Sequence, residues 1–149
     1  MPGYKTHLAG GAITYAIFVC LCSGWLQLSP STALYGFFCT LLGALFPDFD
    51  TKSRGQTLIY RFLVPVLLVL IVQQKFKLFI LVTCVSFIPL VVKHRGLLHK
   101  SWFIIAGSCV VACLLAQFSG AQLPVYLRYA CFFSLGALSH IFLDFKKFW

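Results

Sequence analysis

The sequence predicts an all-α polytopic integral membrane bundle, and three observations support that fold class. Of the 149 residues, 60% are hydrophobic and only 10% are charged, whereas roughly 25% are charged in an ordinary soluble domain. The apolar residues are gathered in six runs with almost no ionisable side chain inside them. Lipid offers unpaired backbone groups no partner, so such runs are expected to be helices. In chain order, the runs are residues 8–26, 32–47, 57–72, 78–92, 101–118 and 124–145.

The first run follows Lys5 and superficially resembles a secretory signal peptide. The run is long and no small-x-small cleavage site stands out after it, so we interpret it as a retained first helix. Its adjacent Gly10 and Gly11 favour close packing against another helix. We expect residues 1–149 to form a single membrane-embedded domain.

The later runs differ in how well they fit a full span. The second and fourth are short, which is compatible with tilted, broken or re-entrant helices. Pro65 and Pro89 favour kinks in the third and fourth, because proline removes a helix hydrogen bond. The fifth and sixth complete the predicted bundle of about six segments.

The basic residues predict the orientation of the helices. The net charge of +9 would indicate nucleic acid in a soluble protein, but here Lys and Arg stand between apolar runs, so no nucleic acid partner is expected. With six spans, nine basic residues share one side, namely Lys5, Lys52, Arg54, Arg61, Lys93, Arg95, Lys100, Lys146 and Lys147. The other side has Lys75, Lys77 and Arg128. Cytoplasmic loops are rich in Lys and Arg, so we expect a multi-pass protein of the bacterial inner (plasma) membrane with both termini in the cytoplasm.

All the acidic residues and histidines fall near one membrane face in this interpretation. The set comprises His7, Asp48, Asp50, His94, His99, His140 and Asp144. The orientation rests on Lys and Arg alone, so this convergence is independent support for a common site. Because imidazole and carboxylate groups are common ligands of divalent metals, we expect these seven residues to bind metal.

In three motifs, the spacing of the candidate ligands along the chain would let two of them bind the same metal ion. In SHIFLD, His140 and Asp144 are four residues apart and would lie on one helix face. In PDFD, the proline ends the preceding run, and an extended backbone would turn both aspartates to the same side. In KHRGLLHKSW, Gly96 favours a turn that brings the two histidines together.

Each group also has a structural interpretation. Alone, His7 would more often be a polar residue at the membrane interface, and the His140/Asp144 pair a structural hydrogen bond. The two aspartates of PDFD could balance Lys52 and Arg54 in a solvated loop. The gathering of all acids and histidines at one face favours a metal site over these separate explanations.

The donor set narrows the ion and its chemistry. Oxygen and imidazole donors without thiolate suit zinc, manganese or iron(II), and the cysteines show no metal-binding spacing. Seven candidates are too many for one tetrahedral ion, so a second ion is plausible. We expect one or two divalent ions, with zinc favoured. Paired ions activate water in ester or phosphoester hydrolysis. We assign catalytic roles to Asp50, His99 and Arg95, with Arg95 as a phosphate clamp, although positive-inside bias explains Arg95 equally well.

Four motifs, THLAGG, LFPDFD, HRGLLH and GALSHIFLD, resemble in order and spacing those of the membrane-bound metal-dependent hydrolases, a family also described as LexA-binding and inner-membrane-associated. The resemblance covers residues 6–144. It implies that the seven residues form the metal site, and it implies a distant similarity to zinc-dependent phospholipases C. The chain departs from the family pattern at Leu98, where relatives tend to have Thr, and in having Lys100 between His99 and Ser101.

We therefore expect a membrane-bound metal-dependent hydrolase, phospholipase C-like or phosphatase-like, acting at the cytoplasmic face. Its expected partners are the lipid bilayer and a lipid-like phosphorylated substrate, and the sequence leaves the oligomeric state open. A metal-ion transporter is an alternative, but it would place ligands near the midplane or at both faces. A second alternative is a non-catalytic adaptor, in which a closed metal site only holds helix ends together.

Overall fold

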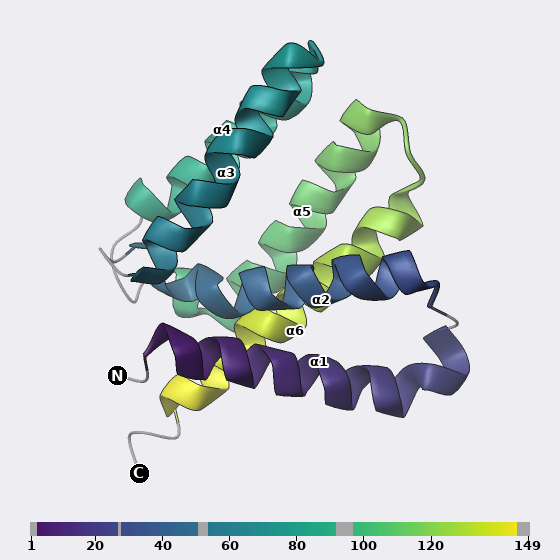
Figure 1. Ribbon diagram of the computed structural model, residues 1–149, viewed down its shortest axis with the longest axis vertical. Helices are drawn as coiled ribbons and strands as arrows, with labels where there is room; N and C mark the ends of the chain where they lie inside the picture. The colour runs from purple at the N-terminus through teal and green to yellow at the C-terminus, as the bar shows by residue number, and fades with distance from the viewer. Residues whose placement is uncertain (1–2, 27, 51–53, 92–96, 146–149) are drawn as a thin grey trace.

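The computed structural model confirms an all-α fold (Figure 1). It describes residues 3–26, 28–50, 54–91 and 97–145, and within them the regular structure is entirely helical. The α-helices are α1 (Tyr4–Leu26), α2 (Pro30–Leu45), α3 (Arg54–Val72), α4 (Phe76–Val91), α5 (Ser101–Ser119) and α6 (Leu123–Phe145). Two short 3₁₀ helices, η1 (Phe46–Asp50) and η2 (Leu97–His99), lie between them.

In the part of the chain that the structure describes, four helices are long and apolar enough to cross a membrane. They are the stretches Tyr4–Cys22, Pro30–Phe49, Ser101–Ser119 and Leu123–Phe145. The apolar stretches of α3 and α4 are shorter, Gln56–Val72 and Phe76–Pro89. The second apolar run was expected to be short, but η1 follows α2 directly and lengthens this apolar stretch. The short apolar helices are therefore the third and the fourth, α3 and α4.

The helices α2 and α6 cross with their backbones in close approach. A Cβ atom on Gly136 would overlap the carbonyl oxygen of Thr40, and one on Gly43 would overlap the carbonyl oxygen of Phe133. Only glycine allows two helix backbones to come this near at both positions. The crossing fixes the end of α2 against the middle of α6.

The first helix packs against both members of this crossing. Gly11 lies against the side chain of Ala44, and Gly10 lies against Leu143 near the end of α6. The predicted close packing at the two adjacent glycines is therefore confirmed. As a result, the first turns of α1 come beside the last turns of α2 and α6.

The remaining helices extend from this body (Figure 1). The hairpin of α3 and α4 turns at Gln74, which adopts a left-handed backbone conformation with φ of 56°. Pro65 and Pro89 both lie inside their helices. The neighbouring helices α5 and α6 are linked by a 2.9 Å hydrogen bond between the hydroxyls of Ser108 and Ser134.

Candidate metal centre

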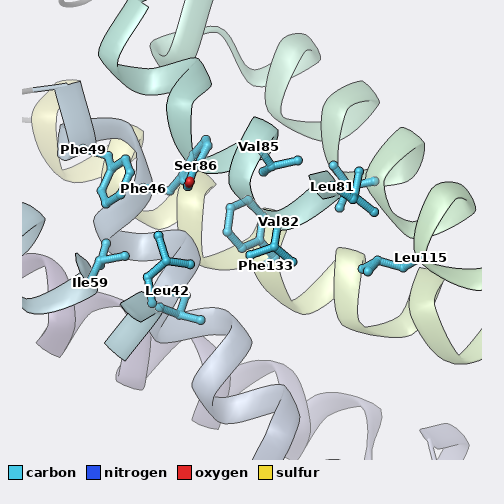
Figure 2. Close-up of a pocket in the computed structure, with 12 residues that line it drawn as sticks. Leu42, Phe46, Phe49, Ile59, Leu81, Val82, Val85, Ser86, Leu115 and Phe133 are labelled. Carbon is cyan, nitrogen blue, oxygen red and sulfur yellow. The ribbon is translucent and has the colours of Figure 1, made fainter. Parts of the chain in front are cut away.

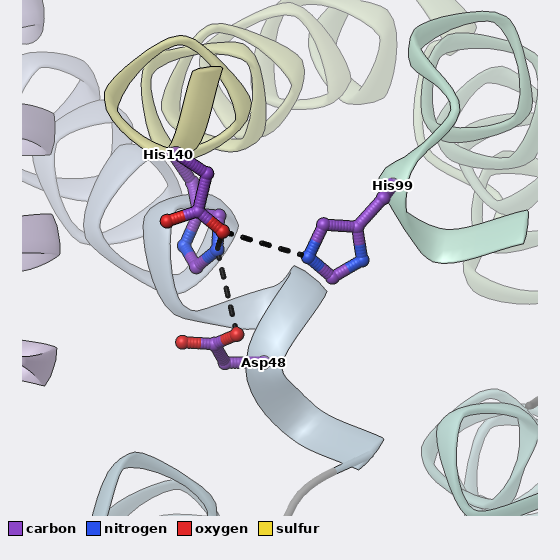
Figure 3. Close-up of side chains that lie close together, drawn as sticks. Asp48, His99 and His140 are labelled. Carbon is purple, nitrogen blue, oxygen red and sulfur yellow. Dashed lines mark ion pairs between the residues drawn. The ribbon is translucent and has the colours of Figure 1, made fainter. Parts of the chain in front are cut away.

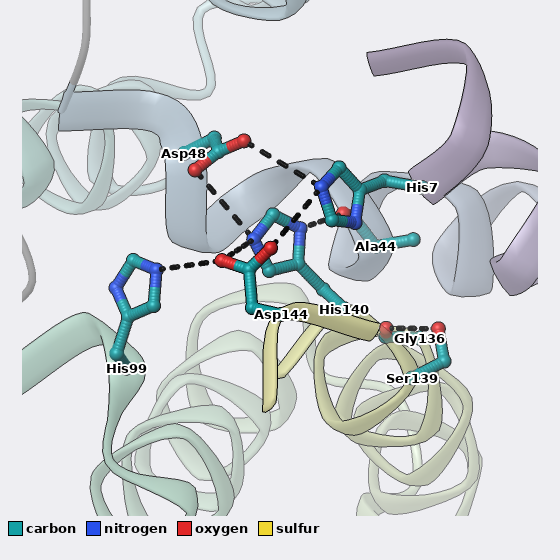
Figure 4. A network of polar contacts seen from close by, with 8 residues as sticks. All are labelled: His7, Ala44, Asp48, His99, Gly136, Ser139, His140 and Asp144. Carbon is teal, nitrogen blue, oxygen red and sulfur yellow. Dashed lines mark hydrogen bonds and ion pairs between the residues drawn. The ribbon is translucent and has the colours of Figure 1, made fainter. Parts of the chain in front are cut away.

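Five of the seven predicted ligands meet at one end of the bundle (Figure 4). They come from the first turns of α1, from η1, from η2 and from the last turns of α6, and they are His7, Asp48, His99, His140 and Asp144. Four of them, Asp48, His99, His140 and Asp144, each offer one ligand atom, and these atoms all lie within 4.8 Å of one another. The structure thus brings together residues that are up to 137 positions apart.

His140 is fully buried, and a backbone contact fixes the orientation of its ring. Its Nδ1 lies 2.7 Å from the carbonyl oxygen of Ala44. The carbonyls in the last turn of a helix lack intrahelical partners, so the end of α2 supplies an acceptor there. A carbonyl can only accept, so Nδ1 donates its proton, and in the neutral form of the ring the lone pair is at Nε2. Metal-binding histidines are commonly oriented in this way.

The contacts around His140 Nε2 are longer than hydrogen bonds. This atom lies 3.5 Å from Asp48 Oδ1 (Figure 3) and 3.6 Å from Asp144 Oδ2 (Figure 4), whereas N–H···O hydrogen bonds measure roughly 2.7–3.2 Å. In the neutral form, with its lone pair at Nε2, the imidazole would face two carboxylate oxygens that also only accept. A tetrahedral zinc ion with bonds near 2.0–2.1 Å would hold its ligand atoms about 3.4 Å apart. The spacing therefore suits donors that share one cation.

His7 and His99 complete the cluster from opposite sides of His140. The His7 ring stacks on the His140 ring, with centroids 3.7 Å apart and planes 16° apart. Its Nε2 lies 3.7 Å from Asp144 Oδ1 and 4.0 Å from Asp48 Oδ2. His99 Nε2 lies 3.9 Å from Asp144 Oδ2. Each carboxylate thus directs one oxygen toward His7 and the other toward His140.

Burial makes a bound cation favourable at this position. Among the described residues, His140 Nε2 and Asp144 Oδ1 are buried polar atoms without a hydrogen bond. Leaving a buried acceptor unsatisfied costs about 1–3 kcal/mol. Divalent ions bound in the cluster would satisfy both atoms and would offset the repulsion between the two carboxylates.

Three residues of the predicted site cannot be placed. The side chain of Asp50 and the whole of His94 and Arg95 lie outside the described residues. The metal-binding roles of Asp50 and His94 and the catalytic roles of Asp50 and Arg95 therefore stay predictions. The placement of His99 within the cluster supports its inclusion among the candidates.

The extended backbone that would turn both aspartates of PDFD to the same side is not found. Residues Phe46–Asp50 form the 3₁₀ helix η1, and Phe46 keeps helical dihedral angles, with φ of −62° and ψ of −40°. The proline did not force its neighbour out of the helical region, because Pro47 is tolerated in the first turn of a new helix. Residues two apart in a 3₁₀ helix do not share a face, so the sequence argument for turning both aspartates to one side does not apply.

Sequence reasoning missed two features that position the cluster. One is the Ala44 carbonyl, a backbone group that no side-chain pattern identifies. The other is the close crossing at Gly43 and Gly136. The tetrapeptide LGAL occurs at both positions, as residues 42–45 and 135–138, and this repeated small-residue signal would have indicated the contact.

The comparisons with known proteins identify a membrane family without an activity. A family described as YdjM inner membrane protein matches residues 1–147. No curated protein and no solved structure was found to match the chain. The family description supports an inner-membrane protein, and it bears on neither hydrolysis nor LexA binding.

Proposed function

The chain belongs to the YdjM inner membrane protein family, and from the geometry of its candidate metal centre we propose that it is a membrane-bound metal-dependent hydrolase. Its substrate is an ester or phosphoester of a lipid-like molecule, and residues 1–149 act as one membrane-embedded domain. The observation that carries the proposal is the bridging arrangement of Asp48 and Asp144 between two imidazoles.

The bridging carboxylates define two sets of donor atoms. One set is His7 Nε2 with Asp48 Oδ2 and Asp144 Oδ1, and the other is His140 Nε2 and His99 Nε2 with the remaining oxygens of both aspartates. We therefore assign two divalent ions to the site, with zinc favoured and manganese or iron(II) accepted by the same donors.

Such paired ions would supply an activated water and would stabilise the charge that develops on the acyl or phosphoryl group as it is transferred to water. The residues of the chain hold this arrangement in place. The Ala44 carbonyl fixes the His140 ring, and η1 holds Asp48 beside it. In this proposal Asp50 and His99 take part in catalysis, and Arg95 binds the phosphate of the substrate.

The position of the ligands argues against the transport alternative. A permeation path needs binding groups near the membrane midplane or at both ends. The five clustered ligands come from helix ends that gather on one side of the bundle (Figure 1). The adaptor alternative requires a closed coordination shell, and an assay of hydrolysis distinguishes it from an enzyme.

Removing the metal is expected to lower both stability and activity. A ligand that binds only the folded state stabilises it by mass action, by about 4 kcal/mol when present at 1,000 times its Kd. Chelation of the detergent-purified protein should therefore lower the melting temperature by several degrees and stop release of phosphate or head group from phospholipids and polyprenyl phosphates in micelles. Adding zinc or manganese back should restore both. An unchanged melt after verified metal removal would contradict the proposed site.

The proposed orientation places both termini and the metal centre in the cytoplasm. Single cysteines at Gln73 and Ser53, in a variant free of native cysteines, would report the two faces. We expect a membrane-impermeant maleimide to label Gln73→Cys in cells with a permeabilised outer membrane, and to label Ser53→Cys only after lysis. The reverse pattern would place the centre outside the cytoplasm.

A further inference from the structure

A second feature lies beside the metal centre and takes no part in the arrangement described above. It is an apolar cleft of about 200 Å³ between the α3–α4 hairpin and the helices α2, α5 and α6 (Figure 2). Of its twelve lining side chains, eleven are apolar. The exception is Ser86, whose hydroxyl already donates to the Thr83 carbonyl at 2.7 Å.

The short helix η1 joins this cleft to the metal centre. Phe46 and Phe49 line the cleft, while Asp48 between them contributes to the cluster. In a 3₁₀ helix, residues three apart lie on the same face, and the rings of Phe46 and Phe49 are accordingly stacked, with planes 16° apart. The Phe46 ring also packs on Phe133, with centroids 5.2 Å apart. One face of η1 is thus apolar and another carries the metal ligand.

The lining determines what the cleft can hold. Water in a cavity needs two to four polar partners, and apolar cavities of about 150 Å³ stay dry and bind hydrocarbons. Among the described side chains that line it, this cleft offers a single hydroxyl, which is already engaged in a hydrogen bond. A polar or charged occupant would lose its hydrogen bonds to water without replacement. A hydrocarbon occupant would gain roughly 0.8 kcal/mol for each buried methylene group.

We propose that the cleft binds one hydrocarbon chain of the lipid substrate whose ester or phosphate group lies at the metal centre. This inference rests on the proposed hydrolase function and specifies the class of its substrate. The volume suits a segment of one chain rather than a whole lipid. The two faces of η1 match the two parts of an amphiphile, because the polar group meets Asp48 and the hydrocarbon meets Phe46 and Phe49.

The test uses phosphatidic acid and a polyprenyl phosphate, each with a photoactivatable diazirine in its hydrocarbon chain. In detergent micelles, wild-type protein should be labelled at cleft residues such as Val82 and Leu115. The probe that labels them more strongly distinguishes an acyl from a prenyl chain. Val82→Trp, which narrows the cleft, should weaken binding on the order of tenfold, as expected for about two buried methylene groups. Val72→Trp is the matched control, because Val72 is 82% exposed on the same hairpin.

Two further measurements separate the cleft from the metal centre and from misfolding. Val82→Trp should keep the wild-type metal content and the wild-type turnover of a short-chain, water-soluble phosphoester. Val82→Ala enlarges the cleft and should retain labelling at Leu115. This variant replaces Val82→Trp in the experiment if the tryptophan prevents folding.

The outcomes distinguish this inference from the hydrolase proposal. Labelling confined to lipid-facing residues such as Val72, with metal-dependent hydrolysis intact, would overturn the hydrocarbon site alone. Labelling in the cleft without any metal-dependent hydrolysis would overturn the hydrolase and still support a bound hydrocarbon chain.

Discussion

Replacing Asp48 with Asn should abolish metal binding and hydrolysis while the helices remain folded. The substitution keeps the shape of the side chain but removes the negative charge that the imidazoles of His7 and His140 share. Loss of a residue that only supports a metal ligand commonly costs 10–100-fold in affinity. Loss of a bridging ligand should therefore reduce metal affinity by more than about 100-fold.

Ser139→Ala is the matched control for this experiment. Ser139 adjoins His140 on α6, and its hydroxyl donates to the Gly136 carbonyl at 2.7 Å, away from the cluster. Metal content by mass spectrometry, turnover of phosphorylated lipid and a thermal melt should match wild type in the control. Equal metal content in Asp48→Asn and wild type would remove the basis of the site. Asp50→Asn and Arg95→Ala, measured in parallel, would test the roles predicted for those residues.

The convergence of the ligands was predictable because it depends on long-range organisation rather than on local backbone geometry. Alternation of apolar runs and basic loops determines which loops share a membrane face. That pattern alone brought His7 to the same end as the His140/Asp144 pair, and the structure places all three in contact. The four-residue spacing of His140 and Asp144 was also sufficient to predict that the two side chains share a helix face, because both lie within one regular helix.

The local details were less predictable because they depend on tertiary contacts. The helical continuation through Phe46 into η1 reverses the usual preference of a residue before proline. It occurs where the Phe46 ring packs on Phe133 of α6. The bond from His140 Nδ1 to the Ala44 carbonyl joins residues 96 positions apart. It exists only because α2 ends where α6 crosses it, and no local sequence pattern specifies that crossing angle.

Gly136→Ala should be among the most destabilising single substitutions in the chain, although it adds only one methyl group. The new Cβ would meet the carbonyl oxygen of Thr40 and the amide nitrogen of Ala44, both of them backbone atoms. Rotation of a side chain cannot relieve such an overlap, so the two helices must separate. Overpacking typically costs 1–3 kcal/mol, and a backbone overlap should lie at or above about 3 kcal/mol.

The same substitution should also weaken the metal site, because the crossing and the cluster are adjacent. His140 lies one turn beyond Gly136, and Ala44 directly follows Gly43, so separating α2 from α6 draws the Ala44 carbonyl away from His140 Nδ1. Gly107→Ala on α5 is the matched control, since a Cβ there meets nothing within 4 Å and alanine favours a helix by about 0.5–1 kcal/mol over glycine. Thermal melts with and without chelator should show a lower melting temperature and a smaller metal-dependent shift for Gly136→Ala, and neither change for Gly107→Ala. Similar melting temperatures for the two variants would mean that α2 and α6 do not approach so closely. A different contact would then have to orient the His140 ring.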